Sequence, residues 1–350
     1  MGYTTALGYT PIFRISKGDD DLTPQFKDRV LSIRVNSVQG GGTADSCDIV
    51  LDDRGWQLAL PNIGEGSATL DISLGYAETQ LYPMGSFEID EVDLSFPPKT
   101  MLLHGNSAGM NSNLKSPLIT SYANQTLNDI VGKLAFSAGV TPQVDPTIGA
   151  IQLEWLHQHS GSGHLLTQLE RRFNALAKFS DGMLSFTQRG SGNNVSGLSI
   201  GSVTLDAADI SDLKMKLTNI GSFGSTKASY WDKDQHKLVW VQAGVAGDPA
   251  SSVPFTIKRA YNTQAEAQAA ADAQQAMLNR KGATGSLTLA KGDPSIRGAQ
   301  HITITGTRSG IDGEYLVSSA THTLVKDAGL TSAIDFESED GAGGEDSASE

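Results

Sequence analysis

A G-x-S-x-G motif comes closest to a catalytic signature in this sequence. It runs through Gly105, Ser107 and Gly109 and follows the apolar segment 101–103. In hydrolases the motif forms a nucleophile elbow, in which a helix directly behind the serine fixes its exposed hydroxyl. Here the next residues are MNSNLKSP (110–117), which are poor helix formers. We therefore expect an interdomain loop at this point and no nucleophilic role for Ser107.

Histidines gather once, at His157, His159 and His164. On a strand the first two would face the same side, as two ligands of one metal could. Zinc needs three or four ligands that a second shell of hydrogen bonds holds in place. No nearby acid completes such a set, and the residues between are rich in glycine and serine. We expect a solvated loop.

Acidic and glycine-rich segments give no stronger signal. Asp19–Asp21 and the pair Asp232 and Asp234 lack the ligand spacing and the distal glutamate of a calcium loop, so both are predicted to be turns. No phosphate-binding glycine motif is present. We predict no catalytic, cofactor-binding or metal-binding residues, no cofactor and no enzyme activity. The scattered carboxylates leave a hydrolase, acting through Ser107 or a carboxylate pair, as an alternative.

Composition narrows the class of protein. The chain has 350 residues, 38 glycines and 12 prolines, which suits a β-rich fold with many turns. Eight of its 39 acidic residues and none of its 26 basic residues lie from Asp327 onward, so the body is only mildly acidic. This argues against binding to nucleic acid or to an anionic membrane. The single Cys47 excludes an internal disulfide and is expected to be buried, and no signal peptide or membrane-spanning apolar run is seen.

Patterning predicts a mainly β protein with an α+β insert. Alternating strands fill 10–104, and a change of register near Asp90 and Glu91 suggests a bulge. Helices are predicted at 126–138, 164–179 and 263–280, the first and last behind capping boxes at Thr126 and Thr263. A hairpin is predicted at 227–241, and an antiparallel meander of four short strands at 285–324.

Four regions follow from these patterns. Residues 1–105 are predicted to form a first small β-barrel, and 106–200 an α+β insert with a glycine-rich linker at 190–201. Residues 201–336 are predicted to form a second β-domain with the alanine-rich helix. The acidic tail, 337–350, is expected to be disordered.

A set of segments, in order and at matching spacing, resembles the late control protein D family, the baseplate hub of contractile phage tails. It is also similar to hubs of tail-derived bacteriocins and to the N-terminal part of type VI secretion spike proteins. The resemblance spans about residues 11–336. It is carried by DIVLDDRG (48–55), LDISLGY (70–76), GSFEIDEVDLSFPP (85–98), TLNDIVGKLAFSAGV (126–140), LLTQLERRFNALAKFSDGMLSF (165–186), KGDPSIRGAQHITITG (291–306) and IDGEYLVSSATHTL (311–324). The family's Gln-x-x-Glu-Ser run before the middle helix is replaced here by HQHSGSG (157–163).

The resemblance implies a non-enzymatic homotrimer with two tube-like β-barrels per chain. Six barrels in a ring would join a sixfold tail tube to a trimeric central spike and form part of the central channel. The implied partners are the spike, the tail tube protein or its initiator, baseplate wedge proteins and the tape measure protein. DNA would pass through a lumen without a dense basic lining and without specific binding. The implied location is the virion tail baseplate, assembled in the bacterial cytoplasm. The alternatives are a tail-associated peptidoglycan hydrolase and a monomeric carbohydrate-binding module of the tail tip.

Overall fold

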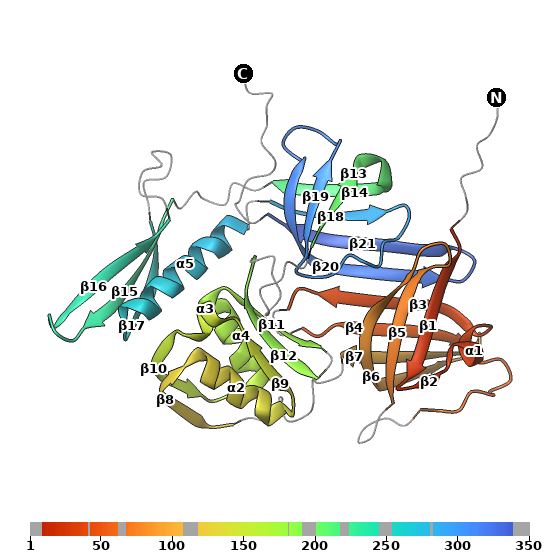
Figure 1. The fold of residues 1–350 in the computed structure, drawn as a ribbon, viewed down its shortest axis with the longest axis horizontal. Helices are drawn as coiled ribbons and strands as arrows, with labels where there is room; N and C mark the ends of the chain where they lie inside the picture. The colour runs from red at the N-terminus through yellow and green to blue at the C-terminus, as the bar shows by residue number, and fades with distance from the viewer. Residues whose placement is uncertain are drawn as a thin grey trace.

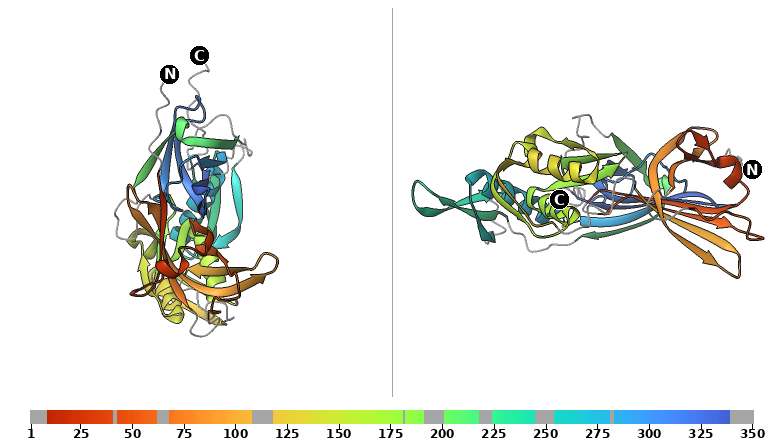
Figure 2. Two further views of the ribbon diagram at one scale, coloured as in Figure 1. Left: turned by 90° about the vertical axis from the view of Figure 1, so that its right-hand side faces the viewer. Right: turned by 90° about the horizontal axis from the view of Figure 1, so that it is seen from below.

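The computed structural model describes residues 9–40, 43–61, 68–107, 118–180, 182–190, 201–217, 224–244, 254–280 and 283–338. Within these ranges the fold is mainly β with a few helices, as the sequence predicts. The molecule is elongated, with one β-region at one end and a small helix-covered sheet at the other (Figure 1, Figure 2). No helix among the described residues is long and apolar enough to span a membrane.

The first β-module carries the N-terminal half of the large sheet. Its elements are β1 (Pro11–Lys17), β2 (Asp20–Asp21), α1 (Thr23–Phe26), β3 (Val30–Val38), β4 (Ser46–Asp52), β5 (Thr69–Tyr76), β6 (Leu81–Ser95) and β7 (Thr100–Ser107). Alternate apolar side chains turn inward from each strand, so Ile33, Ile49, Ile72 and Phe87 are almost fully buried in one core. Cys47 lies in the same core, as predicted.

The second β-module collects strands from the C-terminal third. It contains β13 (Ser202–Asp206), the 3-10 turn η2 (Ala207–Asp209), β14 (Ile210–Leu217), β18 (Ala283–Leu289), β19 (His301–Thr305), β20 (Gly313–Val325) and β21 (Gly329–Glu337). Its own core is built around Ile302, Tyr315, Val317 and Phe336. The rings of Tyr315 and Phe336 pack with their centroids 5.0 Å apart.

One continuous ladder joins the two modules. The strand order is β14-β18-β21-β20-β3-β4-β7-β6-β5-β1-β2, with β19 pairing with β20 and β13 with β19. The junction is the antiparallel pairing of β20 with β3, from Ser319 opposite Val38 to Val325 opposite Ser32. Because β20 and β21 are long, their far ends place Leu324 and Leu330 in the first module's core. The two β-regions therefore share one continuous sheet within the chain.

The insert lies below and to the left of the junction in Figure 1 and has its own core. Its elements are β8 (Thr120–Thr126), α2 (Leu127–Ala138), β9 (Thr141–Val144), α3 (Pro146–Gly149), β10 (Gln152–Gln158), α4 (Ser162–Phe173), β11 (Ala175–Ser180) and β12 (Met183–Gln188). The predicted capping box is present at α2, where Thr126 and Asp129 each bond the other's backbone, and Gly139 ends the helix with a φ of +73°.

We call β15 (Thr226–Asp232), β16 (Lys237–Ala243), β17 (Phe255–Tyr261) and α5 (Gln264–Arg280) the wing. The predicted hairpin is confirmed as β15 and β16, and the alanine-rich helix as α5. The three strands form a sheet of their own, in the order β16-β15-β17, and α5 covers one face. Small buried side chains such as Ala228, Ala267 and Ala271 let the helix lie close to the strands.

Two predicted elements are corrected. The helix predicted at 164–179 ends at Phe173, because Asn174 takes a left-handed conformation with a φ of +49°. Leu176 and Ala177, which matched the helical spacing, belong instead to β11. Their side chains are buried in either case, so apolar spacing alone could not separate the two conformations.

The predicted meander at 285–324 is also corrected. β18 pairs with β14 and β21, whereas β19 pairs with β13 and β20, and the last two predicted strands are one strand, β20. The segment between β18 and β19 is not a hairpin turn but crosses the sheet, with Ile296 fully buried. Gly298 lies so close to Val38 that a Cβ atom there would be 2.2 Å from the Val38 carbonyl carbon.

The bulge predicted near Asp90 and Glu91 is confirmed by a register shift between Ile89 and Glu91 in the pairing of β6 with β7. Three other predictions fall on residues outside the described ranges. These are the loop that follows Ser107, residues 191–200 of the glycine-rich linker, and the acidic tail beyond Ser338.

Candidate functional surfaces

Ser107, the candidate nucleophile, makes a structural contact. It ends β7 and is 6% exposed, and its hydroxyl donates a hydrogen bond to the Phe179 carbonyl, 3.0 Å away. That bond ties the first β-module to β11 of the insert. A serine nucleophile needs a general base within hydrogen-bond reach, and no histidine or carboxylate is bonded to Ser107 among the described residues.

The histidine cluster is brought together in part. His157 lies on β10 and faces the same way as Trp155 and His159, with stacked ring centroids 6.4 and 6.1 Å from its own. Its Nδ1 is 2.8 Å from the Ser121 hydroxyl. His164 instead lies in the first turn of α4, so the solvated loop expected over these histidines is wrong at both ends, which belong to a strand and a helix. Within the part of the chain that the structure describes, no three histidine, cysteine or carboxylate side chains are grouped as a metal site.

The acidic segments are turns only in part: Asp19 and Asp234 lie in turns, but Asp20 and Asp21 form the short strand β2 paired with β1, so the turn predicted at Asp19–Asp21 is corrected there. The Asp21 carboxylate accepts a bond from the Thr23 backbone just before α1, and hydrogen bonding by the Thr23 side chain and backbone lowers the pKa of Asp21. At the tip of the wing hairpin, Asp232 accepts bonds from the backbone of Asp234 and Gln235. Both sets of carboxylates therefore organise the local backbone.

Polar joints fix the insert against both β-modules. The Lys178 ammonium on β11 lies 3.0 Å from the Asp45 carboxylate and 3.2 Å from the Val38 carbonyl. Arg189, which follows β12, bonds Gln39 at 2.9 Å and Glu337 at 3.3 Å, so one side chain links the insert to a residue from each β-module. The insert is thus anchored at the β20–β3 junction.

A separate joint fixes the wing to the insert. The Arg172 guanidinium on α4 lies 2.7 Å from the Glu266 carboxylate on α5, and their side chains are 11% and 1% exposed. Glu266 also accepts a bond from the Glu154 backbone on β10. Glu266 was predicted to complete a capping box at α5. Its backbone N–H donates to the Thr263 hydroxyl, as in such a box, but its side chain accepts a bond from Arg172.

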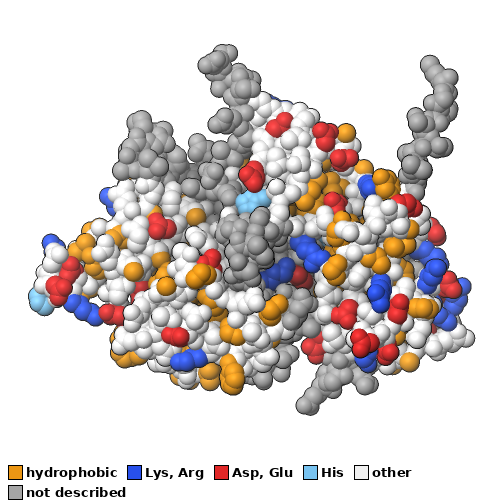
Figure 3. All heavy atoms as spheres, viewed as in Figure 1, with side chains coloured by type: hydrophobic (Ala, Val, Ile, Leu, Met, Phe, Trp, Pro, Cys, Tyr) orange, Lys and Arg blue, Asp and Glu red, His pale blue; other side chains and the backbone are white. Residues whose placement is uncertain are grey.

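The first of three exposed apolar surfaces is the outer face of the wing sheet. Trp231 lies opposite Leu238, and Trp240 follows two residues later on the same side. These three side chains are 49%, 43% and 51% exposed, because α5 packs against the other side of the sheet. In Figure 3 apolar side chains are visible on the wing and along the lower edge of the insert. The run KLVWV (237–241), apolar at consecutive positions, signals a strand that contacts partners on both faces.

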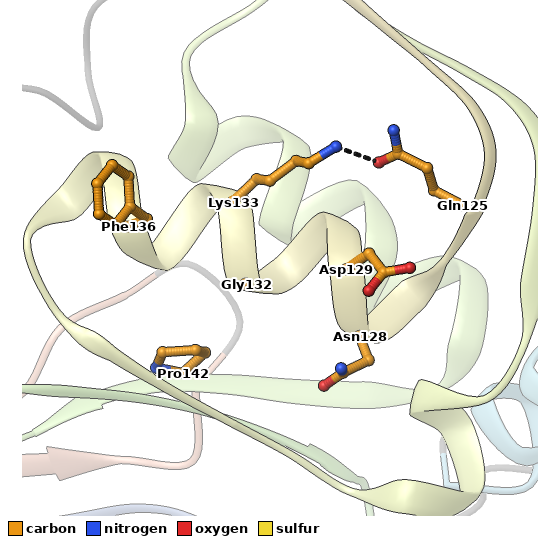
Figure 4. A pocket seen from close by; sticks show the side chains of 7 residues that line it. All are labelled: Gln125, Asn128, Asp129, Gly132, Lys133, Phe136 and Pro142. Carbon is orange, nitrogen blue, oxygen red and sulfur yellow. Dashed lines mark hydrogen bonds between the residues drawn. The ribbon is translucent and has the colours of Figure 1, made fainter.

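The second surface lies on α2 and borders a pocket of about 520 Å³. Figure 4 shows Lys133 bonded to Gln125 on one side of the pocket and the Phe136 ring and Pro142 on the other. Phe136 is 87% exposed, and Gly132 leaves the middle of the helix bare, since a Cβ atom there would meet nothing within 4 Å. A solvated helix face of this kind is suited to packing against another protein.

The third surface is at the turn between β6 and β7. The rings of Trp56 and Phe96 lie 6.5 Å apart, and the Lys99 ammonium lies over both, at 5.4 and 5.9 Å. Trp56 is 49% exposed and Phe96 is 70% exposed. Because each of these three surfaces exposes a large aromatic side chain, we treat them as candidate contact surfaces.

Two known proteins are similar to this chain over almost their whole length. A probable baseplate hub protein of Escherichia phage 186 is 25% identical over 366 residues, covering 93% of this chain and 92% of the relative. A probable baseplate hub protein of Escherichia phage P2 is 25% identical over 367 residues, covering 94% and 93%. This chain is similar over nearly its whole length to phage baseplate hub proteins. No protein-family model matches it.

Solved structures of tail proteins and of a secretion-system component share the fold of this chain. A 43 kDa tail protein of prophage MuSo2 from Shewanella oneidensis has a TM-score of 0.65 at 14% identity, covering 95% of this chain and all of that one. A tail protein from Neisseria meningitidis MC58 has a TM-score of 0.66 at 13% identity, covering 95% and 97%. An Escherichia coli type VI secretion system component, itself similar to phage T4 tail proteins gp27 and gp5, has a TM-score of 0.54 at 12% identity, covering 88% and 73%.

The resemblance to baseplate hubs is therefore confirmed over nearly the whole chain. Both curated relatives carry the name of a hub protein and not of an enzyme, and a hub function in a phage tail is supported. We therefore take the exposed surfaces and the joints as the candidate functional residues. Sequence reasoning predicted no site residues and did not single out Trp231, Trp240 or Phe136.

Proposed function

We propose that this chain is the baseplate hub of a contractile tail and that it works as a cyclic homotrimer. Each copy contributes two β-modules, so three copies place six around the axis, in step with a sixfold tail tube. The same ring has the threefold order of a trimeric central spike. The observation that carries the proposal is the β20–β3 ladder, which holds two β-modules in one continuous sheet.

We further propose that the chain divides as 1–105, 106–200, 201–336 and 337–350, with the wing as an excursion from the second β-module. The wing and the insert keep their own sheets outside the large one. In the ring they would lie outside the β-modules, where their exposed aromatic faces could meet wedge proteins or neighbouring hub copies. The remaining partners would be the spike, the tube protein or its initiator, and the tape measure protein.

The channel would be lined by the β-modules and would conduct DNA without holding it. The body of the chain is mildly acidic, with Asp and Glu in excess over Lys and Arg before the tail. Phosphate groups bind where Lys and Arg gather, so a lumen without such a lining lets DNA slide. A hub map that shows a lysine- and arginine-lined lumen would overturn this part of the proposal.

Light scattering combined with size-exclusion chromatography tests the trimer. The chain should elute, alone or with its spike, with a hub content three times the 36.9 kDa chain mass. A hub that stays monomeric in the presence of its spike contradicts the proposal. Binding of the monomer to a glycan array would then favour the carbohydrate-binding alternative, for which the exposed Trp231 and Trp240 would be the platform. Release of peptidoglycan fragments by the purified chain would favour the hydrolase.

A further inference from the structure

A basic pocket of about 380 Å³ lies between the wing and the insert. Arg171 and Arg172 reach it from the end of α4, Lys258 and Tyr261 from β17, and Gln274 from α5. Nothing in the proposed hub function uses this pocket. It is separate from the exposed tryptophan face, which lies on the other side of the wing sheet.

Positive charge is in excess at the pocket. Arg172 is paired with Glu266 at 2.7 Å, but Arg171, Lys258 and Arg259 are exposed and form no ion pair among the described residues. The Arg172 and Arg259 guanidinium groups lie 5.3 and 5.7 Å from the centre of the same Tyr261 ring. Burial and, secondarily, the charge of Arg259 lower the pKa of Arg172, whereas Glu266 opposes that shift. An anionic ligand would relieve this repulsion.

The strand that borders the pocket is an edge strand of the wing sheet. In the described part of the chain β17 pairs with β15 alone among the strands, and an extended segment can add to such an edge. Edge addition gives affinity through main-chain hydrogen bonds, and side-chain pockets beside the strand select the sequence. The arginines and Lys258 would select carboxylates. The ligand chemistry that fits is an extended acidic peptide.

The chain carries such a peptide close by. Residues 339–350 contain five carboxylate side chains and no basic residue. They follow Ser338, whose backbone donates to the Ala283 carbonyl just beyond the end of α5 at Arg280. At 1.5 Å per residue, Gln274 is about 9 Å along the helix from Arg280. Twelve extended residues reach roughly 40 Å, which is ample for the pocket.

We propose that the acidic segment 339–350 binds in the basic pocket between α4, α5 and β17 of the same chain. The pocket is thus an anion-binding site with a built-in ligand, which any other acidic partner would have to displace. Because the segment is tethered, its effective concentration at the pocket is in the millimolar range, so even a weak contact is populated. This proposal goes beyond the hub function and does not depend on the trimer.

Fluorescence anisotropy of a labelled peptide of sequence EDGAGGEDSASE (339–350) tests it. The titration uses the full chain with its native tail and the full chain with the five tail carboxylates changed to amides (E339Q, D340N, E345Q, D346N and E350Q). The amide-tail chain should bind the peptide at least fivefold more tightly, because its pocket is free, and added salt should weaken the binding. Equal affinity for both chains would mean that the native tail does not occupy the pocket of its own chain, and it would overturn the proposal.

Two further arms locate the site. In the amide-tail chain, R171A/K258A and the milder R171Q/K258Q should weaken peptide binding at least fivefold, while K27A/K326A, which removes two exposed lysines elsewhere, should leave it unchanged. Circular dichroism checks that each variant is folded. Unchanged binding by both pocket variants overturns the site. A single-stranded DNA that competes more strongly than the peptide, through the same two residues, would make it a nucleic-acid site and also overturn the proposal.

Discussion

The first β-module and the wing differ in how the apolar side chains of their sheets are buried. In the first module the sheet curls so that large aliphatic and aromatic side chains fill its own interior, among them Ile33, Ile49 and Phe87. In the wing one alanine-rich helix covers one face of three strands, and the other face shows Trp231 and Trp240 to solvent. A module that buries its own core can be a fixed frame. The wing covers only one face of its sheet, so it needs contacts with other parts of the assembly. Within the chain it is held by the buried Arg172–Glu266 ion pair, and its other face is exposed.

The largest effect should come from the core of the frame. Phe87→Ala removes a side chain that is 1% exposed and should lower the free energy of unfolding by about 3–5 kcal/mol. Equilibrium denaturation in urea measures it. Phe136→Ala is the matched control, since Phe136 is 87% exposed and should change the stability little. Similar losses of unfolding free energy in both variants would mean that the buried core does not stabilise the first β-module more than its exposed side chains do.

The wing joint should come next. Glu266→Ala leaves the buried Arg172 without its carboxylate and the Glu154 backbone without its acceptor. Breaking one side of a buried pair costs about 3 kcal/mol or more. The loss should be local, so hydrogen exchange should speed up in α5 and β10 while β3 and β4 keep their protection. An equal rise of exchange in α5, β10, β3 and β4 would contradict the claim that this ion pair stabilises the wing and the insert without affecting the first β-module.

The exposed Lys233–Glu154 pair is the control for that experiment. Its nitrogen and oxygen lie 2.7 Å apart between the same two regions, but the lysine side chain is 66% exposed. Lys233→Ala should therefore change wing protection by less than about 1 kcal/mol, as for other solvent-exposed ion pairs.

The second β-module should respond to pH through His322, which lies on β20. This side chain is fully buried, its Nδ1 lies 2.7 Å from the Ser332 hydroxyl and its Nε2 2.8 Å from the Ile296 carbonyl, and burial lowers its pKa from 6.5 to about 4. Between these values the unfolded chain binds a proton that the folded chain does not. Stability is therefore intact above pH 6.5 and falls as the pH drops toward 4, by roughly 3 kcal/mol.

Comparing His322→Gln with the native chain isolates this contribution. The variant should be less stable at neutral pH and should show a shallower fall of the unfolding free energy between pH 6.5 and 4. Parallel pH curves for the two proteins would show that His322 does not carry the dependence.

The smallest effect on stability should come from the open wing face. Trp231→Ser with Trp240→Ser should change the unfolding free energy of the monomer by less than about 1 kcal/mol, since both rings are about half exposed. The same pair of changes should reduce incorporation of the hub into tails, measured by quantitative mass spectrometry of purified particles. Normal incorporation would mean that this face has no partner there.

Local features of the fold could be predicted from the sequence, and long-range ones could not. The capping box at Thr126, the left-handed Gly139 and the alanine-rich helix α5 depend on residues within one turn of each other, and they appear where predicted. The pairing of β20 with β3 joins residues more than 280 positions apart, and no local pattern encodes that register. The end of α4 was missed because the apolar spacing continues past Asn174 into β11.

The candidate surfaces were missed for a different reason. The sequence motifs point to reactive side chains, and the structure places Ser107 in a joint, His157 and His159 in a stacked row and His164 on α4. A contact surface has no reactive group to find. Its one sequence signal was the run KLVWV, which lacks the alternation expected of a strand with one solvated face.

An electron cryo-microscopy map of the intact baseplate would show the hub layer itself. We expect a closed ring of three copies of this chain in which six β-modules, two from each copy, surround the channel beneath the tube. A hub layer built from a number of copies other than three, or one in which only one β-module of each chain lies on the ring, would contradict it.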